Sequence, residues 1–253
     1  MQANYRYVVD KLLSLAPRQG EAVLDYGCGK GDIVRLLRDA GLEAFGVEKF
    51  YAGSDIREAV EATGLAGDII RELESDGRIP FADASFDFVV SNQVFEHIED
   101  LQPVVDEIAR VLKPGGKLLC LFPTLGTLRE VHCGVPIAHW FPKRSRLAYY
   151  WLLMFRKLGF GYHKAGKPAR QWAGDFLVWL ADFTHYRTRR QTSRLLGTRL
   201  ADIQATEDGD IAFRLNMAGR GRLAGFARHP LFRGISRTFC RLYGGVVLIA
   251  TKP

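Results

Sequence analysis

Short apolar runs alternate with amphipathic segments over the first 125 residues. Five segments have the runs of Val, Ile, Leu and Phe that are typical of buried strands: residues 22–26, 43–50, 69–73, 85–92 and 117–123. Three segments between them space their apolar residues as a helix does: residues 32–41, 55–63 and 104–116. A further short amphipathic helix is predicted before Pro17. Such alternation predicts an α/β fold, in which helices cover both faces of a parallel sheet.

The alternation stops after Pro123 and resumes late in the chain. Residues 186–207 predict a helix, a turn at Gly197 and a sixth strand, and residues 244–253 predict a last strand. Residues 124–185 and 208–243 have no place in a simple alternating sheet. We therefore expect a seven-stranded sheet with helical insertions after strands five and six.

Composition places the chain among ordinary globular proteins, with 253 residues of which 47% are hydrophobic and 25% charged. The four cysteines form no C-x-x-C pair, which favours a reducing, cytoplasmic setting over a disulfide scaffold or zinc site. The longest apolar run, residues 147–155, is too short to cross a bilayer.

Charge is distributed unevenly along the chain. Residues 1–130 carry 14 basic and 22 acidic side chains, whereas residues 131–174 and 211–253 each carry 8 basic and no acidic ones. Two long acid-free segments indicate surfaces for an anionic partner: a phosphate-bearing substrate, an anionic membrane or a nucleic acid. Plain solvation of surface arginines is the alternative for either segment taken alone.

The candidate chemistry begins at VLDYGCGKG, where Asp25, Gly27, Gly29 and Gly31 form a D-x-G-x-G-x-G pattern between a predicted strand and a predicted helix. Glycines here permit a sharp turn and let a ligand approach the main chain. A dinucleotide fingerprint needs its third glycine one position later, where Asp32 stands, so the pattern argues against NAD or FAD.

Three further segments, residues 79–101, 107–120 and 186–196, join this loop in resembling the class I S-adenosylmethionine-dependent methyltransferases. The resemblance is to the group that includes ubiquinone and menaquinone methyltransferases, in particular to bacterial members with a lid insertion. It implies a single methyltransferase domain over residues 1–253 with a Rossmann-like, seven-stranded doubly wound sheet and S-adenosylmethionine as cofactor. Residues 124–185 would be a helical lid insertion, and residues 208–243 a basic helical insertion before the last strand.

The resemblance also implies cofactor contacts, in the loops that follow the first four strands. Asp25 would lie near the amino group of the cofactor, and Glu48 would hold the ribose hydroxyls. Asp76 is a looser match, because it precedes Pro80 by four residues where the family has five. The full set of expected cofactor residues is Asp25, Gly27, Cys28, Gly29, Gly31, Glu48, Asp76, Phe81, Asn92 and Gln93.

The candidate catalytic residues are Asn92, His97 and His139. Asn92 ends the fourth strand, where the acceptor should meet the methyl group. His97 is a candidate general base, with an alternative role in which Glu96 and His97 only anchor the loop. The segment REVHCGVPIAHWFP would form a polar pocket from Glu130, His132 and His139, unless these are ordinary hydrogen-bonded loop residues. No third clear ligand accompanies them, so we expect no metal site.

The acceptor leaves fewer traces in the sequence than the methyl donor. Residues 91–94 read SNQV, not the Asn/Asp-Pro-Pro-aromatic motif of adenine methylation, and no Pro-Cys dipeptide supports cytosine methylation. We expect methyl transfer to oxygen of a small-molecule or lipid-linked acceptor. An RNA methyltransferase and a non-catalytic S-adenosylmethionine-binding regulator are the alternatives.

A membrane is a candidate partner because apolar and basic residues are interleaved in three segments: residues 143–157, 171–183 and 220–245. The first two would form a lid whose outer surface touches anionic lipid. A buried lid helix without a membrane role explains them equally well. The expected location is therefore the cytoplasm, with peripheral contact at the inner membrane face as a further expectation.

Overall fold

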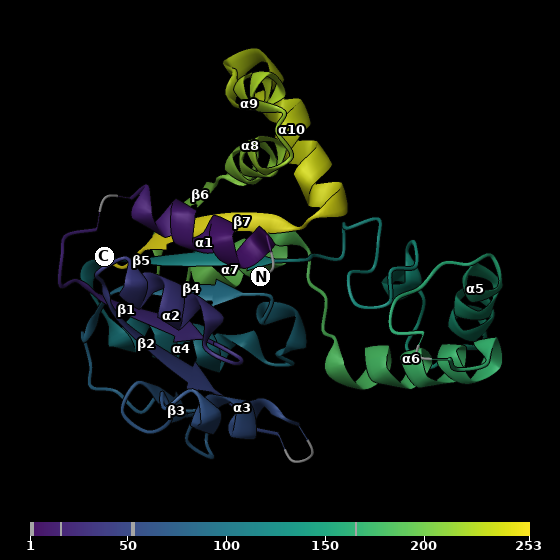
Figure 1. Ribbon diagram of the computed structural model, residues 1–253, viewed down its shortest axis with the longest axis horizontal. Coiled ribbons are helices and arrows are strands. Elements are labelled where there is room, and N and C mark those ends of the chain that lie inside the picture. The colour runs from purple at the N-terminus through teal and green to yellow at the C-terminus, as the bar shows by residue number, and fades with distance from the viewer. Residues whose placement is uncertain (1–2, 16, 52–53, 165) are drawn as a thin grey trace.

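Seven strands form one sheet in the computed structural model, which describes residues 3–15, 17–51, 54–164 and 166–253 (Figure 1). In chain order they are β1 (Ala22–Tyr26), β2 (Glu43–Glu48), β3 (Ile70–Glu72), β4 (Phe86–Asn92), β5 (Leu112–Phe122), β6 (Ala201–Ala205) and β7 (Val246–Thr251). Their spatial order is β3-β2-β1-β4-β5-β7-β6. Strand β7 runs antiparallel to both of its neighbours, and the other pairs are parallel. The predicted seven-stranded α/β sheet is confirmed, and its last strand makes it mixed.

Helices cover both faces of the sheet, because successive strand residues point to opposite faces. Val23 of β1 packs with α1 (Ala3–Leu13), α2 (Asp32–Asp39) and α3 (Ile56–Ala62). Its neighbour Leu24 packs with α4 (Leu101–Val111) and α7 (Arg189–Leu196) on the other face. These two apolar cores hold the sheet rigid, so the loops at its carboxyl ends are well positioned to form a site.

Helix α4 ends earlier than the sequence pattern predicts. Residues 112–116, expected to close that helix, instead begin β5. Pro114 has no N–H for a helical hydrogen bond, while the Gly115 N–H donates to Lys252 O and the Lys252 N–H donates to Gly116 O. Pairing with the last residues of the chain therefore overrides the helical pattern.

Between β5 and α7 the chain forms a helical unit beside the sheet, at the right of Figure 1. It contains a short 3-10 helix, η2 (Ala138–Trp140), followed by α5 (Arg146–Lys157) and α6 (Ala169–Phe183). Ser145 caps α5 by accepting a hydrogen bond from Ala148 N. The unit has its own apolar core, which includes Cys133, Leu152 and Trp172. We call residues 124–185 the insertion.

A second helical unit projects from the sheet between β6 and β7, at the top of Figure 1. It consists of α8 (Glu207–Met217), α9 (Gly221–Arg228) and α10 (Pro230–Tyr243), which we call the α8–α10 unit. Its buried core is small and is built from Ala212, Ala224 and Ala227. Among the described residues, no helix has both the length and the apolar character needed to cross a membrane.

Candidate active site

A cleft of about 820 Å³ opens at the carboxyl ends of β1, β2 and β4. Strand order reverses between β1 and β4, which is where open α/β sheets bind ligands. The cleft is lined by four of the residues predicted to contact the cofactor: Gly27, Glu48, Asp76 and Gln93. These residues are far apart in the sequence, and the fold brings them to one edge of the sheet.

The glycine loop between β1 and α2 forms one wall of this cleft. Gly27 has a φ of +76°, and a Cβ added to it would lie 2.4 Å from Val94 Cγ2, so a larger residue does not fit there. Gly29, with a φ of +53°, has no atom within 4 Å of an added Cβ. The loop is thus packed tightly on one side and leaves open space beside its second glycine.

Glu48 ends β2 and connects that strand to the glycine loop. Its Oε2 accepts a hydrogen bond from Gly29 N at 2.7 Å, and its Oε1 accepts one from Lys49 N at 2.8 Å. Burial raises the pKa of Glu48, although these two hydrogen bonds act against the shift. A carboxylate fixed in this way has further lone pairs available for the hydroxyl groups of a ligand.

Two buried polar side chains beside the loop have no hydrogen-bond partner among the described residues: Asp25 and Asn92. Burial raises the pKa of Asp25 well above its ordinary value, and the nearby Glu48 adds to the shift. Buried polar groups are normally paired, so a ligand that brings a cation and hydrogen-bond donors would satisfy both side chains. The ammonium group of S-adenosylmethionine fits this requirement, and Glu48 fits its ribose.

The other predicted cofactor residues lie outside the lining of the cleft. Cys28 is buried against β2, where its sulfur would be 2.6 Å from a Cβ added to Gly46. Gly31 is the N-cap of α2, and a Cβ there would lie 2.5 Å from Ile70 Cδ1. Phe81 packs edge-on against Phe86, with ring centroids 5.0 Å apart. In the structure these residues pack against β2, β3 and β4.

A second cavity, of about 630 Å³, lies between the sheet and the insertion. Aromatic rings of α6 form much of its wall, from Trp172, Phe176 and Trp179. Gln93 and His97 line this cavity and the cofactor cleft as well. Gln93 has a φ of +61°, uncommon for a residue other than glycine, at the turn between β4 and the 3-10 helix η1 (Phe95–His97). The two cavities therefore meet at the end of β4.

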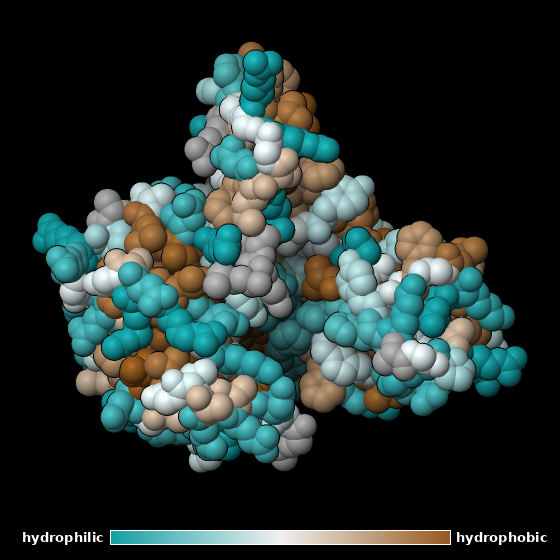
Figure 2. Space-filling model, viewed as in Figure 1, coloured by the Kyte–Doolittle hydropathy of each residue, from teal (hydrophilic) through white to brown (hydrophobic). Residues whose placement is uncertain are grey.

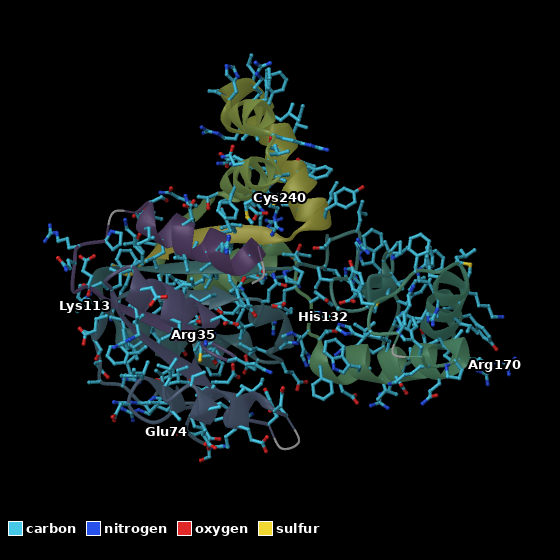
Figure 3. All side chains as sticks on the ribbon, viewed as in Figure 1. Arg35, Glu74, Lys113, His132, Arg170 and Cys240 are labelled. Carbon is cyan, nitrogen blue, oxygen red and sulfur yellow. The ribbon has the colours of Figure 1, made fainter. Side chains whose placement is uncertain are left out.

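Two histidines face each other at this junction, with the ring centroids of His97 and His132 4.9 Å apart. Figure 3 labels His132, which lies between the sheet and the insertion. His97 Nδ1 donates to Phe183 O at 2.5 Å, because a carbonyl can only accept. His132 Nδ1 lies 2.7 Å from Glu130 Oε1. Burial lowers the pKa of His97, which favours its neutral form. In the neutral ring of His97, Nε2 is then the nitrogen without a proton.

Glu130 is a buried carboxylate that orients His132. Burial alone would raise its pKa, but hydrogen bonds from His132, Tyr186 and Cys133 N outweigh burial and bring the pKa to about 2. It is therefore ionised at neutral pH and acts only as an acceptor. The arrangement is a carboxylate–histidine pair, a common way to prepare a general base.

Glu96 completes this polar cluster. Its carboxyl group is buried, accepts no hydrogen bond from another described residue, and has its pKa raised by burial to about 8. Donor atoms of Glu96, His97 and His132 lie within 4.8 Å of one another, a spacing compatible with a metal ion. The expectation of a site without metal thus stays a prediction.

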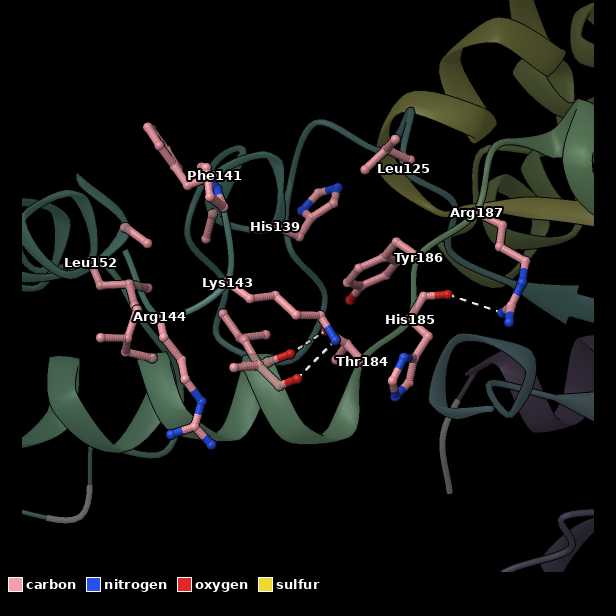
Figure 4. A pocket seen from close by; sticks show the side chains of 16 residues that line it. Leu125, His139, Phe141, Lys143, Arg144, Leu152, Thr184, His185, Tyr186 and Arg187 are labelled. Carbon is pink, nitrogen blue, oxygen red and sulfur yellow. Dashed lines mark hydrogen bonds between the residues drawn. The ribbon is translucent and has the colours of Figure 1, made fainter. Parts of the chain in front are cut away.

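His139, the other histidine predicted to act in catalysis, lines a separate cavity of about 350 Å³ (Figure 4). Its ring lies 4.5 Å from that of Tyr186, between centroids, and burial lowers its pKa. Lys143 lines the same cavity and donates to Ala181 O at 2.8 Å. The structure therefore does not bring His139 to the junction where Gln93 and His97 lie.

Arg187 is a residue that the sequence pattern did not single out, because residues 186–196 were interpreted only as a closing helix. Its guanidinium group donates to three carbonyl groups of the loop after β4: Phe95 O at 3.3 Å, Ile98 O at 2.8 Å and Glu99 O. Nearby, His185 N donates to Glu96 O at 2.6 Å. The segment leaving the insertion thus fixes the loop that carries His97. No local sequence signal could reveal contacts between residues almost 90 positions apart.

Comparison with known proteins agrees with this geometry. Residues 24–120 match the family model described as a methyltransferase domain. The chain is 32% identical over 128 residues to a malonyl-[acyl-carrier protein] O-methyltransferase of Pseudescherichia vulneris, a match covering 50% of this chain and 49% of that protein. It is 36% identical over 123 residues to the demethylmenaquinone methyltransferase of Thermus thermophilus, covering 47% and 53%. The chain thus spans about half the length of the relatives it matches.

Solved structures extend the likeness of the fold to nearly the whole chain. A crystal structure of an S-adenosylmethionine-dependent methyltransferase from Mesorhizobium loti superimposes with a TM-score of 0.55 at 16% identity, covering 96% of each chain. At that identity the likeness concerns the fold. The family match shows that residues 24–120 contain a methyltransferase domain, and the solved structure shows that the whole chain shares the fold of an S-adenosylmethionine-dependent methyltransferase.

Proposed function

We propose that this protein transfers a methyl group from S-adenosylmethionine to an oxygen atom of a small-molecule or lipid-linked acceptor. The observation that carries the proposal is that Gln93 and His97 line both the cofactor cleft and the aromatic cavity. Methyl transfer needs the donor and the acceptor to meet in line with water excluded, and two cavities that share a wall at the end of β4 provide for this.

The cofactor would be held by the residues whose polar atoms the rest of the chain leaves available. Asp25 would face its ammonium group, Glu48 its ribose hydroxyls, and the open side of Gly29 would accommodate its backbone. When bound, S-adenosylmethionine supplies an activated methyl group that leaves sulfur for a nucleophile. The protein itself must position the acceptor and remove the proton of the acceptor hydroxyl.

The second cavity supports an acceptor with a flat or apolar body. Trp172, Phe176 and Trp179 offer aromatic surface, while Lys167 and Asp175, which pair at 2.6 Å, add one polar edge. Such a lining suits a quinone-like, polyketide-like or acyl-linked molecule better than a free nucleotide. Oxygen as the methylated atom is supported by the relative named as an O-methyltransferase.

His132 is the proposed general base. Glu130 accepts the Nδ1–H of His132, so Nε2 is free to take the proton of an acceptor hydroxyl as the oxygen–methyl bond forms. The resulting imidazolium would be stabilised by the adjacent carboxylate of Glu130. His97 lies beside it with Nδ1 held by Phe183 O, and we assign it a role in positioning the acceptor.

The insertion would serve as the lid of the acceptor site, since α6 supplies the aromatic wall and Arg187 anchors the segment that returns from it. A lipid-linked acceptor would reach this cavity from a membrane surface. Exposed apolar residues on α5, including Leu147 and Tyr150, together with basic residues such as Arg146 and Lys157, are compatible with such a surface.

The test is to incubate the purified protein with methyl-labelled S-adenosylmethionine and a bacterial extract, and then to divide the label among organic-phase, nuclease-sensitive and protein fractions. We expect label in the organic phase. His132→Gln should lower its rate of appearance by about 100-fold or more, the range typical of general bases. The matched control is His229→Gln, at the exposed N-cap of α10, which should behave as wild type.

Other distributions of label would contradict parts of the proposal. Label only in the nuclease-sensitive fraction would mean that the methyl acceptor is RNA and not a small or lipid-linked molecule. A wild-type rate for His132→Gln would show that His132 is not the general base, and the proposed methyl transfer would still stand. Absence of label from every fraction, with the cofactor bound, would favour a non-catalytic binding protein.

A further inference from the structure

Among the residues that the structure describes, none of the α8–α10 unit lines the cavities of the proposed active site, yet the unit exposes many large apolar side chains. It rests on the sheet through α1, where the rings of Tyr7 and Phe213 lie 5.5 Å apart between centroids. Its own core consists of small alanine side chains. Most of the large apolar residues of α9 and α10 are consequently left outside that core.

These apolar residues form a stripe along α10. Leu231, Ile235, Phe239 and Tyr243 recur every fourth residue, which places them on one side of a helix. Leu231 is 80% exposed and Ile235 is 69% exposed. Leu223 and Phe226 of α9 are also exposed, and the rings of Phe226 and Phe232 lie 5.8 Å apart. Figure 2 shows hydrophobic residues in brown on this projecting part of the molecule.

The charges of the unit are separated between its base and its outer surface. Its three acidic residues, Glu207, Asp208 and Asp210, lie in the first turn of α8 and are largely buried. They pair with four arginines: Arg214, Arg233, Arg237 and Arg241. Beyond them, residues 211–243 contain no acidic residue. Arg220, the N-cap of α9, and Arg222, in the first turn of that helix, are both exposed.

An outer surface that exposes large apolar side chains and arginines, with no acidic residue in residues 211–243, suits one class of partner best. A second copy of the chain would bring like charges together as it covered the stripe. A nucleic acid would satisfy Arg220 and Arg222 but would leave Leu231 and Ile235 in water. An anionic lipid surface suits both the arginines and the apolar side chains. Basic side chains pair with the headgroups, and the apolar face of a helix enters the boundary with the acyl chains.

We propose that the α8–α10 unit docks the protein on an anionic lipid surface, with the stripe of α10 in the interface and Arg220 and Arg222 against the headgroups. The docking is a property of this unit and does not depend on the acceptor or on methyl transfer. It is separate from the exposed face of α5, which lies on the insertion.

The test is co-sedimentation of the full chain with vesicles of phosphatidylcholine and phosphatidylglycerol in equal parts, and with vesicles of phosphatidylcholine alone. We expect binding to the mixed vesicles that weakens with salt. The double variant Leu231→Gln/Ile235→Gln should weaken binding at least about tenfold, because it removes two apolar anchors. Arg220→Gln/Arg222→Gln should also weaken it about tenfold or more, since each cation near the surface contributes roughly fivefold.

The matched control is Leu13→Gln, the same change at an exposed leucine of α1 on the sheet. It should bind the mixed vesicles as wild type does. All variants alter exposed side chains, so their circular dichroism and their affinity for S-adenosylmethionine should be unchanged.

Three results would overturn the proposal. The first is unchanged vesicle binding by Leu231→Gln/Ile235→Gln, which would move any lipid contact to another surface such as α5. The second is an absence of vesicle binding together with a dimer, in analytical ultracentrifugation, that the same variant dissociates. The third is an absence of vesicle binding together with RNA binding that Arg220→Gln/Arg222→Gln abolishes. Because the measurement uses neither cofactor nor acceptor, its failure is distinguishable from failure of the proposed function.

Discussion

Acidic side chains are buried both beside the cofactor cleft and at the base of the α8–α10 unit. The two regions differ in whether these side chains have hydrogen-bond partners. Asp25 is buried with neither carboxyl oxygen hydrogen-bonded among the described residues. Asp210 is equally buried, but it accepts from Arg214 Nε at 2.9 Å and from Cys240 Sγ at 3.4 Å. A buried polar group that the chain leaves unpaired costs stability. The difference therefore indicates which carboxyl groups serve a ligand and which serve the fold.

The contrast extends to the other acids of each region. Glu96 is buried and accepts no hydrogen bond from another described residue, whereas Glu207 accepts from Arg241 Nε at 3.0 Å. Substitutions beside the cleft should thus change ligand affinity and the pH dependence of stability. Substitutions at the base of the unit should lower the free energy of unfolding. The following predictions test this division, beginning with the largest expected effect.

Glu96 should make the folded protein less stable as the pH rises. Its pKa is about 8 in the folded state against an ordinary value of 4.5, so folding retains a proton that the unfolded chain releases. The contribution of this proton to stability is complete below the pKa of the unfolded state. It is lost as the pH rises through the pKa of the folded state. Between pH 5 and 8 we expect the free energy of unfolding to fall by several kcal/mol, at up to about 1.4 kcal/mol per pH unit.

The measurement is urea unfolding at several pH values for wild type and for Glu96→Gln, which is neutral throughout. The variant should show a much flatter dependence on pH. Equal slopes for the two proteins would mean that Glu96 is not protonated when buried.

Glu48→Gln should weaken S-adenosylmethionine binding by about 1–3 kcal/mol, or roughly 5- to 150-fold, because a neutral amide replaces a charged acceptor. Calorimetric titration of the cofactor into wild type and variant gives both affinities. Glu72→Gln, at the exposed end of β3, is the matched control and should bind as wild type. Identical affinities for Glu48→Gln and wild type would remove Glu48 from the cofactor site.

Asp210→Asn should lower stability and leave cofactor affinity nearly unchanged, in contrast to Glu48→Gln. It removes the charge that pairs with Arg214, so we expect the free energy of unfolding to fall by about 1–2 kcal/mol. Affinity for S-adenosylmethionine should stay within about twofold of wild type. Urea unfolding and the same titration check both statements, and a large loss of affinity would show that the unit is coupled to the cleft.

Much of the fold could be predicted because its signals are local. The apolar runs of β1 and β4 and the glycine loop after β1 depend on neighbours in sequence, and the structure has them where the pattern predicted. The end of α4 was misplaced because it depends on pairing between Gly115 and Lys252, at the far end of the chain. Distant pairing of this kind leaves no local trace.

The same limit applies to the site and to the charge pattern. His132 and His139 look alike in sequence. The proposal of His132 as the base rests on its place beside Gln93 and His97 in the aromatic cavity, which no local sequence signal reveals. The acid-free segment 211–253 also looked like a free basic surface. Its arginines 214, 233, 237 and 241 in fact pair with acids at 207, 208 and 210, so the exposed charge is smaller than the count suggests.

We propose that Asp25 and Asn92, which are buried and have no hydrogen-bond partner among the described residues, belong to a site for S-adenosylmethionine. The decisive measurement is how much the cofactor raises the free energy of unfolding of wild type, Asp25→Asn and Asp210→Asn. At 100 times its dissociation constant the cofactor should stabilise wild type and Asp210→Asn by about 2.7 kcal/mol. At the same concentration it should stabilise Asp25→Asn much less, although this variant without cofactor should be at least as stable as wild type. Equal stabilisation of Asp25→Asn and wild type would contradict the account.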